Sequence, residues 1–390
     1  MKKNCPACTS SDLHAFYTVR DVPIQQNTPK VTRQDAYQTP RGDVVLAWCG
    51  QCGFVTNIAF DETLDIYTTD YNNVQGYSPT FQAYVDSIAD MLINRYDLHD
   101  KHIIEIGHGK GDFLRQLCEQ GHNTGTGYDP SHIGELTALG GRIRFVQDFY
   151  TDKYASDTAD CFVARHLIEH VSNLDELVGG MRKAIGDNTD AIVFFETPDV
   201  RWILENATFW DIFYEHCSLF SPTSIARLFA RHGFDVLRVT SAFEGQYMWL
   251  EAKPAAAEEG SIPDDLNSSH EIERLVKQFV ANYEQKYAKI KGYIQNAGQE
   301  TRKAAIWGAG AKGVTFLNTL KPPLDEIPVV VDINPNKQHR YIPGSGQYII
   351  APEELPNYQP DPIFIMNPNY KDEIKQTISR LGLDVTTIII

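Results

Sequence analysis

Short apolar runs alternate with amphipathic segments between residues 101 and 253. The runs at 103–106 and 160–165 are short enough to be buried strands, and Phe113 and Leu117, which follow the first run, lie one helical turn apart. Strands that alternate with helices are typical of a parallel sheet covered by helices. We therefore predict the α/β fold class for this part of the chain.

Three glycines at alternate positions, Gly107, Gly109 and Gly111, separate the first predicted strand from its helix. Glycine lets the backbone approach a ligand closely, so a nucleotide-like ligand is expected here. The spacing is G-x-G-x-G, because Asp112 stands where the dinucleotide fingerprint needs a further glycine. Glu105 lies inside the strand, and this combination is similar to motif I of the class I S-adenosylmethionine (SAM) methyltransferases. A tight turn without a ligand, or an NAD site, is the alternative.

Acidic and basic residues follow the later strands of the same predicted sheet. Asp129 comes about 20 residues after the glycine turn, where two carboxylate oxygens can hold the ribose hydroxyls; the alternative is a helix cap. Asp148 is expected beside the adenine amino group. Arg165 and His166 end the fourth strand, on the edge that faces the methyl donor in a class I fold, and we assign both to SAM. His170 lies one helical turn after His166, a spacing that more often marks packed histidines than a metal site.

Two further predicted strands, 233–239 and 246–252, close the sheet. A terminal hairpin whose last strand is antiparallel distinguishes class I methyltransferases from ordinary dinucleotide-binding folds. This feature favours SAM independently of the glycine turn.

An aromatic-rich segment, 209–222, carries Glu215 and His216 side by side. An imidazole has an ordinary pKa of about 6.5, and beside a carboxylate in an apolar wall it is suited to act as a general base. The alternative is a histidine that braces the following helix. We predict His216 as the base and Glu215 as the group that orients or polarises it.

The N-terminal 60 residues contain two C-x-x-C pairs, which are Cys5 with Cys8 and Cys49 with Cys52. Four thiolates complete a closed tetrahedral site, so structural zinc is expected, and a redox thiol cluster is the alternative. The gap between the pairs exceeds that of a compact zinc ribbon, which predicts a small sheet between them. Metal binding is expected to supply much of the folding free energy of so short a segment.

After a linker-like stretch, 254–265, the segment 269–294 is predicted as one long amphipathic helix. A second glycine turn follows, in which Gly308 and Gly310 fit the dinucleotide fingerprint. Asp332 ends the next predicted strand. This segment is a half-Rossmann unit, and Lys312 at its helix N-terminus is placed to meet the phosphates of a nucleotide-linked substrate.

The net charge of −16 and the pI of about 5.2 argue against a nucleic-acid partner and against an anionic membrane surface. No apolar run approaches the length of roughly 20 residues that a transmembrane helix needs, and the N-terminus lacks the apolar core of a signal peptide. We therefore expect a cytoplasmic monomer or homodimer that acts on a small molecule.

The order of cysteine pairs, SAM-type domain, long helix and half-Rossmann unit resembles the three-domain SAM-dependent sugar C-methyltransferases of deoxysugar biosynthesis. The resemblance implies a nucleotide-diphospho-keto-sugar acceptor, usually dTDP-linked, that is methylated at carbon 3 through an enolate. It places catalytic groups in a Tyr-x-Glu-His segment, whose tyrosine falls here on Phe213. Tyr214, one residue later, is the candidate for contact with the substrate carbonyl. The alternatives are O-methylation, methylation of another small molecule, an NAD-linked oxidoreductase that uses the second glycine turn, and a non-catalytic binding protein.

The corresponding domains are expected at 1–75 (zinc binding), 76–255 (SAM binding), 256–300 (linker and long helix) and 301–390 (substrate binding). Tyrosines in the stretch that leads into the SAM-type domain either cover the core edge or form a lid over the ligand. We assign Tyr77 of this stretch, together with His170 and the second glycine turn, to the acceptor.

Overall fold

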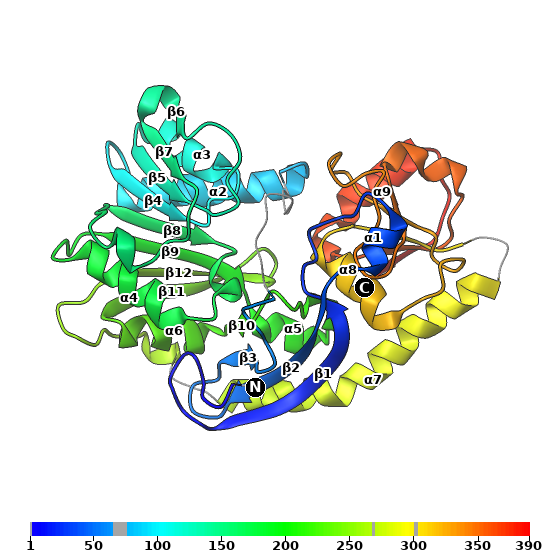
Figure 1. The fold of residues 1–390 in the computed structure, drawn as a ribbon, viewed down its shortest axis with the longest axis horizontal. Helices are drawn as coiled ribbons and strands as arrows, with labels where there is room; N and C mark the ends of the chain where they lie inside the picture. The colour runs from blue at the N-terminus through cyan, green and yellow to red at the C-terminus, as the bar shows by residue number, and fades with distance from the viewer. Residues whose placement is uncertain (1, 65–75, 267–269, 300–302) are drawn as a thin grey trace.

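The computed structural model describes residues 2–64, 76–266, 270–299 and 303–390. Two of the tyrosines predicted either to cover the core edge or to form a lid, Tyr67 and Tyr71, lie outside these residues. Three sheets and a long helix organise the chain (Figure 1). No helix in the described part of the chain is long and apolar enough to cross a membrane.

The largest sheet has eight strands. In the order in which they lie side by side, they are β11 (Phe234–Ala242), β12 (Tyr247–Pro254), β9 (Ile192–Pro198), β8 (Cys161–Arg165), β4 (His102–Ile106), β5 (Thr124–Tyr128), β7 (Ile143–Val146) and β6 (Thr137–Ala138). The strands from β9 to β7 are parallel, whereas β12 runs antiparallel to both of its neighbours. The predicted terminal hairpin is therefore confirmed.

Alternate residues of the central strands enter different hydrophobic cores. Ile103 packs in the core that contains the buried side chains of α2 (Pro79–Tyr96) and α3 (Asp112–Gln120), whereas Ile104 packs in the core beneath α4 (Leu174–Ile185) and α6 (Pro222–Arg231). Side chains of a strand point alternately to opposite faces, so a sheet with helices on both faces needs apolar residues at every position. Ile103, Ile104 and Ile106 of β4 are apolar for this reason, and Glu105 is the exception within the strand.

The N-terminal sheet contains β1 (Leu13–Pro23), β2 (Arg41–Cys49), β3 (Val55–Asn57) and β10 (Ser218–Leu219). Strands β1 and β2 confirm the sheet predicted between the cysteine pairs, and β3 follows the second pair. A short helix, α1 (Arg33–Tyr37), connects β1 and β2. Strand β10 comes from far along the chain and pairs with β3, so the segment directly after His216 is held by the N-terminal lobe.

The C-terminal sheet has five parallel strands, in the order β15 (Tyr348–Ile350), β14 (Val329–Val331), β13 (Ala305–Trp307), β16 (Ile363–Ile365) and β17 (Thr387–Ile389). Helices α8 (Ala311–Leu320) and α9 (Lys371–Arg380) accompany it. The predicted long helix is α7 (His270–Gln299), which runs along the base of the molecule from the large sheet to this lobe (Figure 1). One hydrophobic core joins Tyr17 of β1, Phe279 of α7 and Phe316 of α8.

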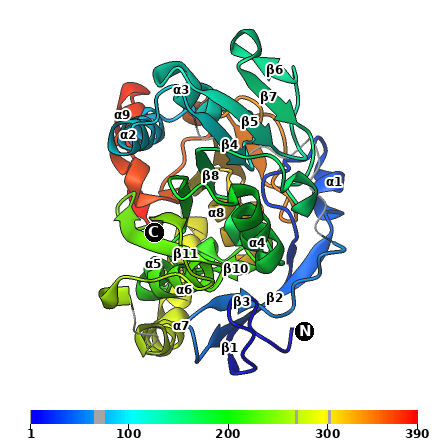
Figure 2. The same ribbon diagram turned by 90° about the vertical axis from the view of Figure 1, so that its left-hand side faces the viewer.

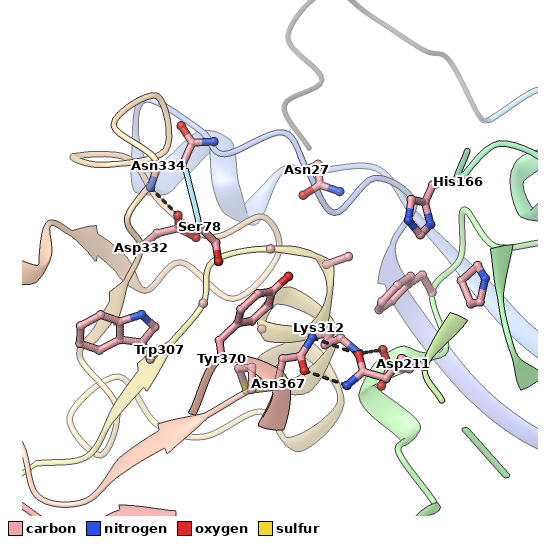
Figure 3. Close-up of a pocket in the computed structure, with 18 of the residues that line it drawn as sticks. Asn27, Ser78, His166, Asp211, Trp307, Lys312, Asp332, Asn334, Asn367 and Tyr370 are labelled. Atoms are coloured by element: carbon pink, nitrogen blue, oxygen red, sulfur yellow. Dashed lines mark hydrogen bonds and ion pairs between the residues drawn. The ribbon is translucent and has the colours of Figure 1, made fainter. Parts of the chain in front are cut away.

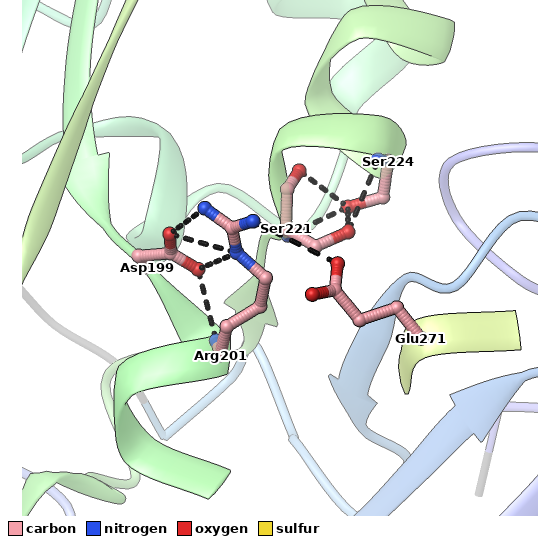
Figure 4. Close-up of polar contacts among 5 residues, drawn as sticks. All are labelled: Asp199, Arg201, Ser221, Ser224 and Glu271. Carbon is pink, nitrogen blue, oxygen red and sulfur yellow. Dashed lines mark hydrogen bonds and ion pairs between the residues drawn. The ribbon is translucent and has the colours of Figure 1, made fainter. Parts of the chain in front are cut away.

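An ion-pair chain connects α7 to α5 (Val200–Asn206) (Figure 4). Asp199 accepts hydrogen bonds from the Arg201 side chain at 2.7 to 3.2 Å, and Arg201 also lies 3.7 Å from Glu271 of α7. Burial raises the pKa of Asp199, and the Arg201 guanidinium opposes that effect. Nearby, Ser221 and Ser224 form the capping box that starts α6.

The lobes also meet on the other side of the molecule, where the start of α2 contacts the first turn of α9 (Figure 2). The hydroxyls of Ser78 and Thr80 donate to Glu373 at 2.8 and 2.9 Å. The side-chain amides of Gln246 and Asn367 exchange two hydrogen bonds of 2.8 and 3.0 Å, and both residues are buried. These contacts enclose a space between the large sheet and the C-terminal sheet.

Candidate active site

The first glycine turn lies at the carboxyl edge of the large sheet, between β4 and α3. Gly107, Gly109 and Gly111 all have positive φ angles, of +75°, +58° and +79°. A Cβ at Gly111 would lie 2.5 Å from the ring of Phe145, whereas a Cβ at Gly109 would meet nothing within 4 Å. Gly111 is therefore needed for packing, and Gly109 borders open space at the position where a ligand is expected.

Two carboxylates support this turn. The Gly109 amide donates to Asp129 at 2.8 Å, and the other oxygen of Asp129 accepts from the amide and hydroxyl of Ser131. Glu105 is 3% exposed, and one of its oxygens has no hydrogen-bond partner among the described residues. Burial raises the pKa of Glu105 to about 7, against the opposing effect of Arg165. This orphaned buried oxygen fits a ligand that carries an amino group and a sulfonium.

Arg165 and His166, at the end of β8, face Glu196 of β9. Arg165 donates to Glu196 at 2.7 Å, and the Tyr84 hydroxyl donates to the same carboxylate. Burial alone would raise the pKa of Glu196, but Arg165 and the other neighbours hold it below its ordinary value. His166 has a positive φ of +50°, and its ring nitrogens lie 3.5 Å from Glu169 and 3.4 Å from Glu196. Arg165 and His166 are therefore fixed by a charged network.

Asp148, expected near adenine, follows β7. Its carboxylate accepts hydrogen bonds from Lys153 and from the Tyr154 hydroxyl, and these bonds lower its pKa. The residue is half-buried. The structure thus places it at the same sheet edge as Asp129, and it is already engaged by neighbouring side chains.

The second glycine turn repeats the geometry of the first. The Ala309 amide donates to Asp332 at 2.8 Å, and the other oxygen of Asp332 accepts from the Asn334 amide at 2.8 Å. Gly308 has a φ of +119°. In both lobes, an acidic residue at the tip of the second strand therefore ties the glycine turn to its own loop.

A cavity of about 270 Å³ lies between the large sheet and this second turn (Figure 3). Its wall combines Tyr77, His166, His170 and His216 with Gly308, Gly310, Lys312 and Asp332, and Asn27 of the N-terminal lobe contributes as well. The structure therefore brings together the residues assigned to the acceptor and the predicted base.

Lys312 does not present a free charge to this cavity. Its ammonium forms an ion pair with Asp211 across the boundary between the lobes (Figure 3). The same ammonium also lies 5.1 Å from the ring centre of Trp202. In this structure Lys312 holds two lobes together.

Three potential proton carriers meet at one wall of the cavity. A carboxylate oxygen of Glu169 and one ring nitrogen each of His170 and His216 all lie within 4.8 Å of one another. The rings of His170 and His216 make an edge contact with centres 4.7 Å apart, and the Nδ1 atom of His216 has no hydrogen-bond partner among the described residues. Burial lowers the pKa of His216 well below its ordinary value, and His170, His166 and Lys312 add to the effect. His216 is thus a neutral imidazole at neutral pH.

The neighbours of His216 face the N-terminal lobe. Glu215 accepts a 2.5 Å hydrogen bond from the backbone amide of Gln26 and lies 4.0 Å from His170. Tyr214 is buried, and its hydroxyl accepts from the Asp61 amide at 3.0 Å. Tyr214 is not among the residues that line the cavity, and its expected contact with a substrate carbonyl stays a prediction. Phe213 and His216 line the cavity, whereas Tyr214 and Glu215, which lie between them in the chain, contact the N-terminal lobe.

The four cysteines of the two pairs come together at the N-terminal lobe. Sγ atoms of Cys5 and Cys52, and of Cys8 and Cys49, lie 3.6 Å apart. A tetrahedral zinc ion with Zn–S bonds of about 2.3 Å requires sulfur atoms separated by roughly 3.8 Å. The cluster therefore has the donor set and nearly the dimensions of a closed four-thiolate site.

Comparison with known proteins identifies two domains in this chain. Residues 80–239 match a methyltransferase domain, and residues 266–389 match a C-methyltransferase C-terminal domain. Together with the relative below, these matches support a SAM-dependent C-methyltransferase. The C-methyltransferase NovU of Streptomyces niveus is 25% identical over 347 residues, and the match covers 85% of this chain and 81% of NovU.

Solved structures resemble this methyltransferase over less than half of its length. The pyocyanin biosynthetic protein PhzM is 17% identical over 44% of this chain, with a TM-score of 0.34. The magnesium protoporphyrin IX methyltransferase ChlM of Synechocystis PCC 6803 is 15% identical over 47%, with a TM-score of 0.35. The matches span 55% of PhzM and 88% of ChlM, and likeness at this level adds nothing to the assignment.

The sequence prediction missed several groups at the site. Glu196 is an acidic residue near the end of β9, as Asp129 is directly after β5, and this signal was visible in the sequence. Asn27 and Lys337 reach the cavity from irregular segments of two other lobes, so no local pattern marks them.

Proposed function

We propose that this methyltransferase adds a methyl group to the carbon beside the ketone of a nucleotide-diphospho-keto-sugar, through an enolate. Two features support the proposal. The cavity extends from the carboxyl edge of the large sheet to a second nucleotide-type glycine turn, and a neutral imidazole lies in its wall. The overall resemblance to sugar C-methyltransferases fits both.

The observation that carries the proposal is the state of His216. A neutral imidazole with an unpartnered Nδ1 accepts the proton from the carbon beside the ketone, and the electron pair of the broken C–H bond becomes the enolate. Glu169 is 1% exposed and lies within reach of His170 and His216, so its carboxylate stabilises the imidazolium that forms. Glu215 lies 4.0 Å from His170, and we assign it the role of orienting the His170 ring.

SAM, when bound, supplies an electrophilic methyl group. We assign its site to the first glycine turn, with the chain's own groups as follows. Gly107, Gly109 and Gly111 admit the ligand, and Glu105 faces its positive charge. Asp129 serves the ribose and Asp148 the adenine. Arg165 and His166 are held in place by Glu196 and form the wall toward the acceptor.

We assign the nucleotide half of the acceptor to the second turn, at Gly308, Gly310 and Asp332. Lys312 serves this half by keeping Asp211 and the turn together. Tyr77 borders the same cavity, and its hydroxyl accepts a 3.2 Å hydrogen bond from Asn336. Zinc at Cys5, Cys8, Cys49 and Cys52 is proposed as structural.

Deuterium exchange into the substrate measures proton removal by the base separately from methyl transfer. A dTDP-linked 4-keto sugar is incubated in D₂O with the enzyme and S-adenosylhomocysteine, and deuterium at carbon 3 is followed by NMR. We expect rapid incorporation with the wild type and a loss of about 10²- to 10⁴-fold with His216→Ala. His99→Ala, an exposed histidine outside the site, is the matched control.

Equal exchange by His216→Ala contradicts the assignment of the base. A second arm uses SAM with a ¹³C-labelled methyl group, and the carbon spectrum of the product shows whether the methyl is bound to carbon or oxygen. A methyl ether as the product contradicts the enolate mechanism.

A further inference from the structure

A lysine that the glycine fingerprint does not include lies buried at the cavity. Lys337 is 5% exposed, and burial lowers its pKa, with Asp332 and Glu215 opposing the effect. Its ammonium donates to the Asn27 side chain at 3.1 Å and to the Ala309 carbonyl at 3.5 Å. Among the described residues, no carboxylate oxygen lies within the 4.0 Å of an ion pair. A buried charge with only neutral partners is costly, so an anionic partner would stabilise it.

The N-terminus of α8 points to the same place. The helix begins after Gly310, and no side chain caps it. A Cβ built on Gly310 would lie 3.9 Å from the Lys337 ammonium, so the ammonium and the helix terminus are neighbours. Both line the cavity. The free amide groups and the dipole of a helix N-terminus favour a negative charge, and the ammonium adds a full positive charge beside them.

Lys312 differs from Lys337 in the partner that it already has. The Lys312 ammonium is paired with Asp211, and a phosphate group would have to compete with that carboxylate. Lys337 has no such competitor. The charge balance therefore favours Lys337 as the group that meets an anion.

The segment that carries Asn27 crosses from the N-terminal lobe to the C-terminal lobe. Within this segment, 23–30, the Gln26 amide donates to Glu215, and Lys30 exchanges backbone hydrogen bonds of 2.9 and 2.8 Å with Tyr341. Asn27 accepts from Lys337 between these two points. One short segment of the cysteine-bearing lobe therefore contacts both the catalytic segment and the buried ammonium.

We propose that Lys337, presented by Asn27 and the N-terminus of α8, forms the subsite for the diphosphate of the acceptor. The inference rests on the proposed function and deepens it. The N-terminal lobe thereby supplies part of the acceptor site, in addition to holding Glu215.

The test is calorimetric titration of the full-length protein with dTDP, with inorganic pyrophosphate and with thymidine. Lys337→Met removes the charge and keeps a similar length of side chain. We expect this variant to bind dTDP and pyrophosphate about 10- to 100-fold more weakly, as for loss of hydrogen bonds to a charged group, and thymidine with unchanged affinity. Lys375→Met, an exposed lysine of α9, is the control, and SAM titration reports whether each variant is folded.

Unchanged dTDP affinity in a Lys337→Met variant that binds SAM overturns the subsite. If that variant fails to bind SAM, the variant Asn27→Leu tests the subsite, because it removes the side-chain oxygen that accepts the hydrogen bond from Lys337 and leaves the lysine in place. We expect a several-fold loss of dTDP affinity, and an unchanged affinity overturns the proposal. Tight dTDP binding that depends on Lys337, without deuterium exchange into the keto sugar, would leave the subsite standing and contradict the proposed function.

Discussion

Glu105 makes SAM binding depend on pH in a predictable direction. Its carboxyl is buried in β4, directly before the glycine turn, and its pKa is raised to about 7 because burial disfavours the charged form. A ligand with an ammonium and a sulfonium group favours the ionised carboxylate. SAM binding should therefore lower the pKa of Glu105 and release a proton near neutral pH.

The magnitude follows from this pKa. If SAM binds only to the ionised form, the apparent Kd is multiplied by one plus the ratio of protonated to ionised Glu105. That factor is close to one at about pH 8, two at about pH 7 and roughly ten at about pH 6. SAM affinity is thus expected to fall about tenfold between about pH 8 and about pH 6.

The assay is calorimetric titration with SAM in buffers of different ionisation enthalpy, which gives both the Kd and the number of protons released. Glu105→Gln keeps the size of the side chain and does not titrate, so its SAM affinity should be weaker at about pH 8 and nearly independent of pH. A wild-type affinity that stays constant over this range, with no proton release, would refute the reasoning. So would an unchanged pH dependence in Glu105→Gln.

Two other predictions test the framework around the site. Gly109→Ala should lose SAM affinity and about 1–2 kcal/mol of stability, because alanine is strained at a positive φ. Gly111→Ala should lose more stability, because its Cβ would overlap the ring of Phe145. Thermal unfolding and SAM titration of both variants check this, and equal stability of the two would contradict it. Arg201→Met leaves the buried Asp199 carboxylate without its cation and should lower stability by about 3 kcal/mol. The double variant Asp199→Asn/Arg201→Met should restore most of this loss, because it also removes the buried negative charge. Thermal unfolding that shows no such recovery would refute the ion-pair argument.

Features that depend on neighbouring residues could be predicted from the sequence. The strand before Gly107, the glycine turn and the amphipathic helix after it follow from apolar spacing, since each element needs only its own residues to show its period. The four cysteines were predicted as one cluster because each C-x-x-C pair is a local chelating motif.

Side-chain direction in irregular segments could not be predicted in this way. Tyr214 and His216 belong to the same aromatic-rich segment, yet one faces Asp61 and the other the cavity. β10, which follows this segment, pairs with β3, and β3 lies more than 150 residues earlier in the chain. Lys312 had the spacing of a phosphate-binding residue, but Asp211 of another lobe pairs with it.

By itself, the sequence determined the α/β class, the two glycine turns and their acidic partners, because these rest on short-range periodicity and on the backbone freedom of glycine. Only the tertiary structure decided which charged groups face the shared cavity. Asn27, His216 and Lys337 come from three lobes, and their meeting depends on packing between elements that are far apart in the chain. Burial acts on two of these groups as well, since the loss of water lowers the pKa of His216 and of Lys337.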